Sequence, residues 1–345
     1  MMREKCVWKV VQCLLAAAFC LVTAGICATE IVPKIPESVS TPIAERDWQA
    51  DRFDAKFGVK NNNAPPERPV PKRMLPPLHR EDVGVIRRVK VPGDMKVAAL
   101  TFDFCELQTT VSGCDMGIVN FLRTEKLPAT FFMCGKWMRS HARRLRQIMT
   151  VPFFEVANHA WSHGNCALLS RAELEAQVLA TQGEYELVRE KLLSQNSQDG
   201  QDLHRMPQVP HLFRLPYARS TPQALEVIAA LGLRVVLWDV VAENGSDCTN
   251  IINARRAAAR AAQTVRPGSI ILLHANLVPR GSAQLLKELV ALLGDKGYRF
   301  VTVGELLSLG EPETVMDGYF CRPGDNLQLD KKFGPKGTGV GRREH

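Results

Sequence analysis

The stretch Phe153–His163 reads FFEVANHAWSH and passes from an apolar run into a polar turn that carries two histidines. The apolar part predicts a buried strand, and Ser170 with Glu173 forms a capping box that starts the next helix. If the turn is helical, His159 and His163 share one face, because residues four apart do so. Neutral imidazole is a common zinc ligand, so this pair is a candidate metal site.

The chain repeats this pattern of apolar strand and helix from Lys96 onward. The predicted strands are residues 97–102, 129–133, 153–158, 212–215, 234–241, 269–273 and 299–303. Such continuous apolar runs are typical of parallel strands buried on both faces. Their alternation with helices predicts an α/β fold, either a barrel or an open doubly wound sheet. In both architectures the active site lies at the carboxyl ends of the strands.

Seven polar or aromatic residues and one proline occur at or near these predicted strand ends. They are Asp103, His159, His163, Arg214, Pro216, Tyr217, Asp239 and His274. Taken alone, each has a plainer explanation, such as a helix cap for Asp103 or a buried, hydrogen-bonded imidazole for His274. Their joint occurrence around one predicted mouth favours an active site.

The N-terminal segment predicts export. Three basic residues precede the short apolar run of residues 14–22, and small residues follow, as in a secretory signal peptide spanning residues 1–28. Cleavage is expected after Ala24 or Ala28, and an uncleaved anchor is the alternative. The expected location is therefore secreted or periplasmic.

Two extensions flank the predicted folded domain at residues 96–310. Residues 29–95 are expected to form a proline-rich arm or linker that wraps partly on the domain, and residues 311–345 a basic, glycine-rich tail that is partly disordered. The net charge of +8 is explained by a solvated surface or by attraction to an anionic envelope surface. No basic-aromatic stripe points to nucleic acid, and we expect a monomer.

Cysteines of an exported protein are in an oxidising compartment, where disulfides form. Beyond the signal the chain carries Cys105, Cys114, Cys134, Cys166, Cys248 and Cys321. This even number predicts disulfides, with Cys105 bridged to Cys134 or to Cys114. No CxxC pair occurs, so a thiolate zinc site is not expected.

Five short motifs resemble those of the polysaccharide deacetylase family (NodB homology, carbohydrate esterase family four), in the same order and at similar spacing. They are Thr101–Asp103, His159–His163, Arg214–Tyr217, Trp238–Asp239 and Leu272–His274. The resemblance spans residues 95–310 and implies a distorted (β/α) barrel of about seven strands in a single domain. It further implies removal of N-acetyl, sometimes O-acetyl, groups from a polysaccharide such as peptidoglycan or a chitin-like glycan.

The resemblance also implies residue roles. Asp103 corresponds to the general base, Arg214 to the group that orients it, and His274 to the general acid. His159 and His163 correspond to ligands of a divalent metal, most simply zinc, and the backbone around Tyr217 corresponds to the oxyanion donor. Trp161, Pro216 and Asp239 are expected to contact substrate.

Two positions depart from the family pattern. Phe104 stands where the family places the third metal ligand. Asp115 is our preferred replacement; a site with two histidines and water, or loss of metal binding, are the alternatives. The acid that orients His274 is expected near Glu243 or Asn244.

The favoured hypothesis is therefore a secreted, metal-dependent glycan deacetylase. An inactive glycan-binding module of the same fold is the second hypothesis, motivated by Phe104. A hydrolase of a small cyclic or linear amide is the third, and the secretory signal argues against it.

Overall fold

Ten strands form one sheet that closes into a barrel. The computed structural model describes residues 43–55, 64–195, 206–243 and 248–335, so the predicted signal peptide lies outside the described residues. The ring runs in the order β1 (Val85–Lys90), β6 (Arg234–Val236), β5 (Leu212–Phe213), β4 (Phe154–Asn158), β3 (Ala129–Met133), β2 (Val97–Phe104) and β8 (Ser269–His274). A bridge between Arg88 and Ser269 joins β8 back to β1 and closes it. The expected barrel is confirmed.

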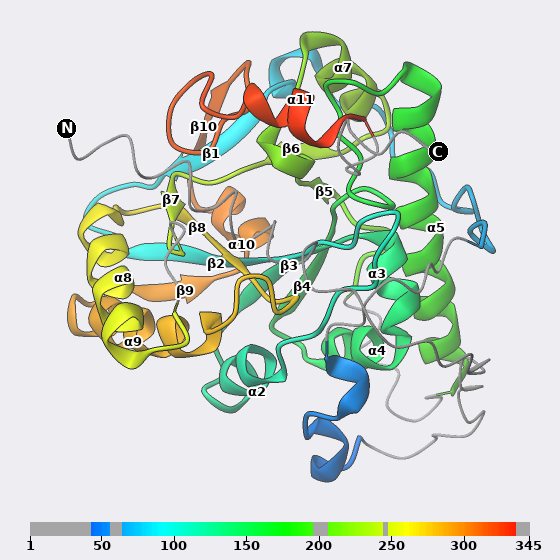
Figure 1. Cartoon of the computed structure of the whole chain (residues 1–345). Helices are drawn as coiled ribbons and strands as arrows, with labels where there is room; N and C mark the ends of the chain where they lie inside the picture. The colour runs from blue at the N-terminus through cyan, green and yellow to red at the C-terminus, as the bar shows by residue number, and fades with distance from the viewer. Residues whose placement is uncertain (1–42, 56–63, 196–205, 244–247, 336–345) are drawn as a thin grey trace.

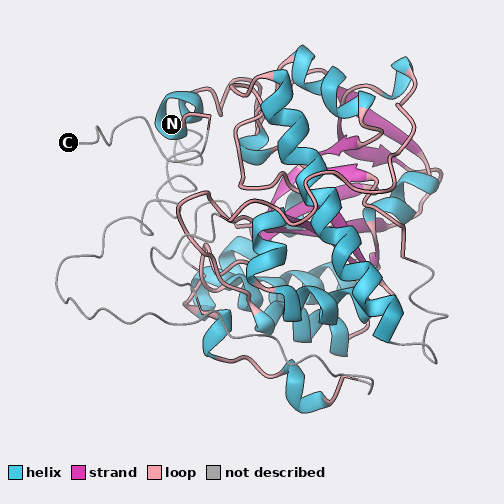
Figure 2. Ribbon diagram, turned by 90° about the vertical axis from the view of Figure 1, so that its right-hand side faces the viewer, coloured by secondary structure: helices cyan, strands magenta, loops and turns pink. Residues whose placement is uncertain are grey.

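Helices surround this ring, and Figure 2 shows them covering the strands from the outside. They are α2 (Met116–Thr124), α3 (Gly135–Ser140), α4 (Ala142–Thr150), α5 (Arg171–Gln195), α7 (Pro222–Ala230), α8 (Ile251–Thr264), α9 (Ser282–Asp295), α10 (Val303–Ser308) and α11 (Gln328–Phe333). Short 3-10 turns occupy Glu45–Trp48, Arg52–Asp54, Arg80–Asp82 and Pro216–Ala218. The long α5 runs along one side, and α8 and α9 lie on the other (Figure 1).

Strand β2 shows how the sequence determines which way each side chain points. All eight of its residues are buried, as expected for a parallel strand covered on both faces. Leu100, Phe102 and Phe104 belong to the core that packs under α2, α3, α8 and α9, whereas Ala99 belongs to the second core with Ile270. Because successive side chains alternate across a strand, Asp103 points away from the Phe104 side.

Three predicted boundaries are wrong. The expected strand 234–241 is split into β6 and β7 (Val240–Val241). The arm contributes β1, which pairs with β6 and is one of the strands that form the ring. The tail contributes β10 (Glu311–Val315), which pairs antiparallel with β1, and also helix α11. Strand β9 (Arg299–Val301) pairs with β2 as an additional strand.

The described part of the arm is bound to the domain. Trp48 is 5% exposed and packs in the core beneath α2. The buried Asp54 carboxylate accepts hydrogen bonds of 2.7 and 2.5 Å from the Arg144 guanidinium. Arg68 likewise pairs with Glu186 on α5 at 2.6 Å. An arm too poor in apolar residues to fold alone is thus ordered by contacts with the barrel.

Within the described ranges, no helix is both long enough and apolar enough to cross a membrane.

Candidate active site

The carboxyl ends of four strands bring the predicted polar residues to one pocket. Asp103 lies near the end of β2, His159 follows β4, Arg214 follows β5, and His274 ends β8. Asp103, His159 and His274 line a pocket that opens to solvent, together with His163, Tyr217 and Glu243. The structure thus brings Asp103, His159, His163, Tyr217 and His274 together around one pocket.

Arg214 holds Asp103 in place. Its Nη1 donates to Asp103 Oδ1 at 2.8 Å, and neither residue is more than 3% exposed. The other guanidinium nitrogens donate to the carbonyls of Val236 and Leu237. Burial lowers the pKa of Arg214, and the charge of Asp103 opposes this shift. The second carboxylate oxygen of Asp103 is left to face His159, whose Nε2 lies 3.6 Å away.

The two histidines are presented by a turn that is not helical. Ala160 and His163 have positive φ angles of 62° and 56°, and the imidazole rings meet edge to face with centroids 4.8 Å apart. Burial lowers the pKa of His159, and burial lowers the pKa of His163 well below its ordinary value. Both rings are therefore neutral near pH 7, which is the form that binds metal.

Each ring also has a nitrogen available for a ligand. His159 Nδ1 lies 2.9 Å from the carbonyl oxygen of Arg214, so it carries the proton and Nε2 keeps its lone pair. His163 Nδ1 is buried and has no hydrogen-bond partner. A buried polar atom without a partner is unusual and calls for an explanation such as a missing ligand.

Cys105, rather than Asp115, completes a group with these histidines. The ligand atoms of Cys105, His159 and His163 all lie within 4.8 Å of one another. Asp115 instead caps α2, where its carboxylate accepts hydrogen bonds from the backbone N–H groups of Gly117 and Ile118. The preferred third ligand was therefore wrong, because a local cap satisfies that carboxylate at the helix start.

The predicted bridges from Cys105 are wrong as well. Cys105, Cys114, Cys134 and Cys166 are buried free thiols. The Cys134 thiol donates to the carbonyl of His159 at 3.2 Å. The sequence suggested a disulfide because it could not show that Cys105 faces the histidines.

Phe104 does not occupy the site at all. Its ring lies 4.0 Å from that of Trp137 on α3, and the side chain is fully buried in the outer core. The departure from the family pattern therefore leaves the pocket open. Phe104 supplies no metal ligand, so the third ligand has to come from another residue.

Glu243 orients His274. Its Oε2 lies 2.5 Å from His274 Nδ1, and its Oε1 accepts from the backbone N–H of His274 and from the Ser282 hydroxyl. Burial alone lowers the pKa of His274, but the charge and hydrogen bond of Glu243 outweigh it, so the pKa is raised. Of the two candidates for this role, Glu243 fills it, and Asn244 lies outside the described residues.

Several known proteins resemble this chain across its folded domain. Residues 90–236 match the family model described as polysaccharide deacetylase. The peptidoglycan-N-acetylmuramic acid deacetylase of Bacillus subtilis is 29% identical over 230 residues, which cover 67% of this chain and 42% of that protein. Over these residues the chain is similar to the polysaccharide deacetylase family.

Other deacetylases also resemble this chain. A chitooligosaccharide deacetylase of Rhizobium leguminosarum is 26% identical over 168 residues, covering 48% of this chain and 64% of that protein. The chain thus spans less than two thirds of the length of either relative. A solved peptidoglycan N-acetylglucosamine deacetylase matches with a TM-score of 0.51 and 22% identity over 68% of this chain and 97% of that one, which supports the fold.

Tyr217 lines the pocket from a strained turn. It has a φ of 58°, and its buried hydroxyl has no hydrogen-bond partner. Its ring meets His163 edge to face and stacks on Phe333 of α11, with centroids 4.9 Å apart. Pro216 begins the same turn and is buried beside the pocket. The tail therefore supports the turn from which an oxyanion donor is expected.

Two expected substrate contacts lie elsewhere. Asp239 accepts from the Ser269 hydroxyl and the Ile270 N–H at the start of β8, the opposite end of the strand from His274. Trp161 packs against Gly135 and under the Arg139 guanidinium on α3, and it does not line the pocket. Asp239 was misplaced because the strand predicted at 234–241 breaks before its mouth end.

The sequence also missed one apolar wall of the pocket. Phe320, from the tail, lines the pocket, and its ring lies 5.5 Å from that of Trp238. Nothing in the local sequence around Phe320 marks it as part of a site. Only the pairing of β10 with β1 brings this segment to the mouth.

A Glu243→Gln substitution tests the coupling to His274. We expect kcat to fall about 10- to 100-fold, as when the partner that orients a functional histidine is removed. Because Glu243 raises the pKa of His274 against burial, its loss lowers that pKa, and the imidazolium is lost at a lower pH. The alkaline limb of the kcat profile should therefore move to lower pH.

The control for this change is Ser282→Ala, which removes one hydrogen bond to Glu243 and leaves its charge. It should move the alkaline limb less than Glu243→Gln does. An alkaline limb that stays in place in Glu243→Gln would show that His274 is not the acid.

Proposed function

We propose that this protein is a secreted, metal-dependent hydrolase that removes N-acetyl groups from a peptidoglycan-like or chitin-like polysaccharide. Similarity to the polysaccharide deacetylase family supports deacetylation of a glycan, and the names of the relatives support an acetylated polysaccharide substrate. The observation that carries the proposal is a carboxylate fixed by Arg214 and an imidazole fixed by Glu243, both beside two neutral histidines.

The histidines fit a divalent metal. Both are neutral, both are buried, and His163 Nδ1 has no partner. His159 and His163 would hold the ion, and nitrogen donors of this kind suit zinc. When bound, such an ion polarises an amide carbonyl as a Lewis acid and acidifies water.

The remaining residues supply the proton transfers. Asp103 is the proton acceptor for the attacking water, because its Oδ2 faces His159 while Arg214 holds Oδ1. His274 lines the same pocket, and its raised pKa favours the protonated imidazole. It can therefore donate a proton to the leaving amine, which is a poor leaving group unless protonated. The backbone of the Tyr217 turn is the expected donor to the oxyanion.

Secretion is part of the proposal and rests on the signal-like sequence of residues 1–28. A glycan of the cell envelope is available only outside the cytoplasm, so location and substrate agree. Determining the N-terminal residue of the protein recovered from the periplasm or medium tests cleavage after Ala24 or Ala28.

The test of function is acetate release from N-acetylated peptidoglycan fragments and chitooligosaccharides. We expect release by the metal-loaded protein, loss on chelation, and recovery when zinc is restored. His163→Ala should lose both metal and activity. The matched control is His141→Ala, because this buried histidine lies beside Ser112, outside the ligand group. No acetate from any acetylated glycan, with zinc demonstrably bound, would refute the proposal.

A further inference from the structure

We propose that the thiolate of Cys105 is the third protein ligand of the metal, which makes the site a two-histidine, one-cysteine centre. This inference deepens the proposed function and rests on it for the presence of a metal. It replaces Asp115, and it reverses the expectation that cysteine takes no part in metal binding here.

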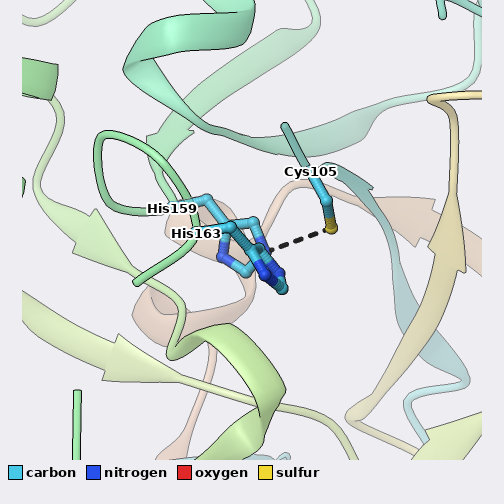
Figure 3. Close-up of side chains that lie close together, drawn as sticks. All are labelled: Cys105, His159 and His163. Atoms are coloured by element: carbon cyan, nitrogen blue, oxygen red, sulfur yellow. Dashed lines mark hydrogen bonds between the residues drawn. The ribbon is translucent and has the colours of Figure 1, made fainter. Parts of the chain in front are cut away.

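The three side chains converge from two loops. Cys105 follows β2, and both histidines lie in the turn after β4. Its Sγ lies 3.5 Å from His159 Nε2, and Figure 3 shows the sulfur facing the nitrogens of the two imidazoles. The three residues are 7%, 1% and 5% exposed, so their ligand atoms meet in a nearly closed space. A metal ion among them needs only small movements of side chains that already face one another.

The alternation of side chains along β2 explains why residue 105 can be a metal ligand and residue 104 cannot. Asp103 points into the pocket and Phe104 into the outer core, so the next side chain on the pocket side is that of Cys105. The backbone there is fixed, because the Cys105 carbonyl accepts from Ser112 Oγ at 2.6 Å and from Asn276 Nδ2 at 2.8 Å. These hydrogen bonds fix the backbone of Cys105 before any metal binds, as expected for a preorganised metal site.

A second observation points to a ligand at this place. His163 Nδ1 is buried without any hydrogen-bond partner, which is costly unless something binds it. Cys105 also lies close to Asp103 and His274, whose ligand atoms form a second compact group with it. There, Arg214 holds Oδ1 of the carboxylate and Glu243 holds Nδ1 of the imidazole, and both residues are assigned to proton transfer. We therefore assign the metal to the group that Cys105 forms with His159 and His163.

The donor set determines which metal is preferred. Thiolate and imidazole are soft and borderline ligands that favour zinc and cobalt over magnesium, calcium or manganese. A coordinated thiol is deprotonated, so the negative charge of sulfur partly neutralises the ion in a buried site. We expect the protein to bind zinc in the presence of excess magnesium.

X-ray absorption spectroscopy of the zinc-loaded full-length protein tests the assignment directly. We expect one sulfur scatterer at about 2.3 Å beside nitrogen at about 2.0 Å. The cobalt-substituted protein should show a sulfur-to-cobalt charge-transfer band in the near ultraviolet. Cys105→Ala should lose both signals, and its zinc affinity should fall by more than the about 10- to 100-fold typical of an outer-shell change.

Two further variants separate ligation from structure. Cys105→Asp should lose the sulfur signals yet keep zinc, because a carboxylate also binds it. Cys114→Ala removes another buried free thiol, one outside the ligand group, and should keep both signals. If Cys105→Ala does not fold, the spectrum of the unaltered protein still decides.

The outcomes distinguish this inference from the proposed function. Bound zinc with only nitrogen and oxygen scatterers, together with acetate release, would overturn the cysteine ligand and leave the deacetylase intact. A sulfur scatterer without acetate release would support the ligand and refute the activity. A protein that binds no zinc, cobalt or other divalent ion would overturn the inference.

Discussion

Replacing Asp103 with asparagine should lower kcat about 10²- to 10⁴-fold, the usual contribution of a positioned general base. The amide has the same shape as the carboxylate but cannot take a proton from water. Its oxygen can still accept from Arg214, so the barrel should persist. The measurement is kcat for acetate release, with zinc content and thermal unfolding recorded on the same sample.

The matched control is Asp239→Asn, which changes a partly buried aspartate in the barrel. Its carboxylate serves Ser269 and Ile270 at the far end of β8. Its replacement should lower the free energy of unfolding and leave kcat within a few-fold of the parent protein. An Asp103→Asn protein that retains the parent kcat would remove Asp103 from the reaction.

Replacing Arg214 with methionine should cost about 3–5 kcal/mol of unfolding free energy, as expected when one partner of a buried ion pair is removed. Arg214 is fully buried, and its loss leaves Asp103 and the carbonyls of Val236 and Leu237 without donors. Urea unfolding measures the change. Activity should fall as well, because Asp103 is no longer oriented.

A double substitution sharpens this prediction. Adding Asp103→Asn to Arg214→Met removes the unpaired charge, so part of the lost stability should return. The surface control is Lys72→Met, whose pair with Glu190 is exposed and should contribute less than about 1 kcal/mol. If Arg214→Met is no more costly than Lys72→Met, the buried pair does not stabilise the barrel.

Local sequence was sufficient for most of the strands and for the core of the candidate site. Apolar runs of strand length predicted the parallel barrel, because strands buried on both faces need such runs. Asp103, His159, Arg214 and His274 then followed from one rule, namely that parallel strands place their carboxyl ends together. The sequence offered Glu243 and Asn244 as candidates for the residue that orients His274. The contact between Glu243 and His274 in the structure identifies Glu243 as that residue.

Contacts between distant segments decided the rest. Cys105 could be a disulfide partner or a ligand until the direction of β2 placed its sulfur by His159. The predicted strand 234–241 is two short strands, so Asp239 lies at the end of the barrel opposite the pocket. The Asp115 carboxylate accepts hydrogen bonds from the first turn of its own helix, α2. The sequence by itself determined the strands, their order in the chain and the chemistry available at their ends, because these depend on periodicity and residue type over a few positions. Only the tertiary structure decided that the arm supplies strand β1 of the barrel and that the tail pairs with it through β10. It also decided that Phe320 lines the pocket and that the Cys105 thiol faces the histidines. The reason is that pairing between segments far apart in the chain leaves no local pattern in the sequence.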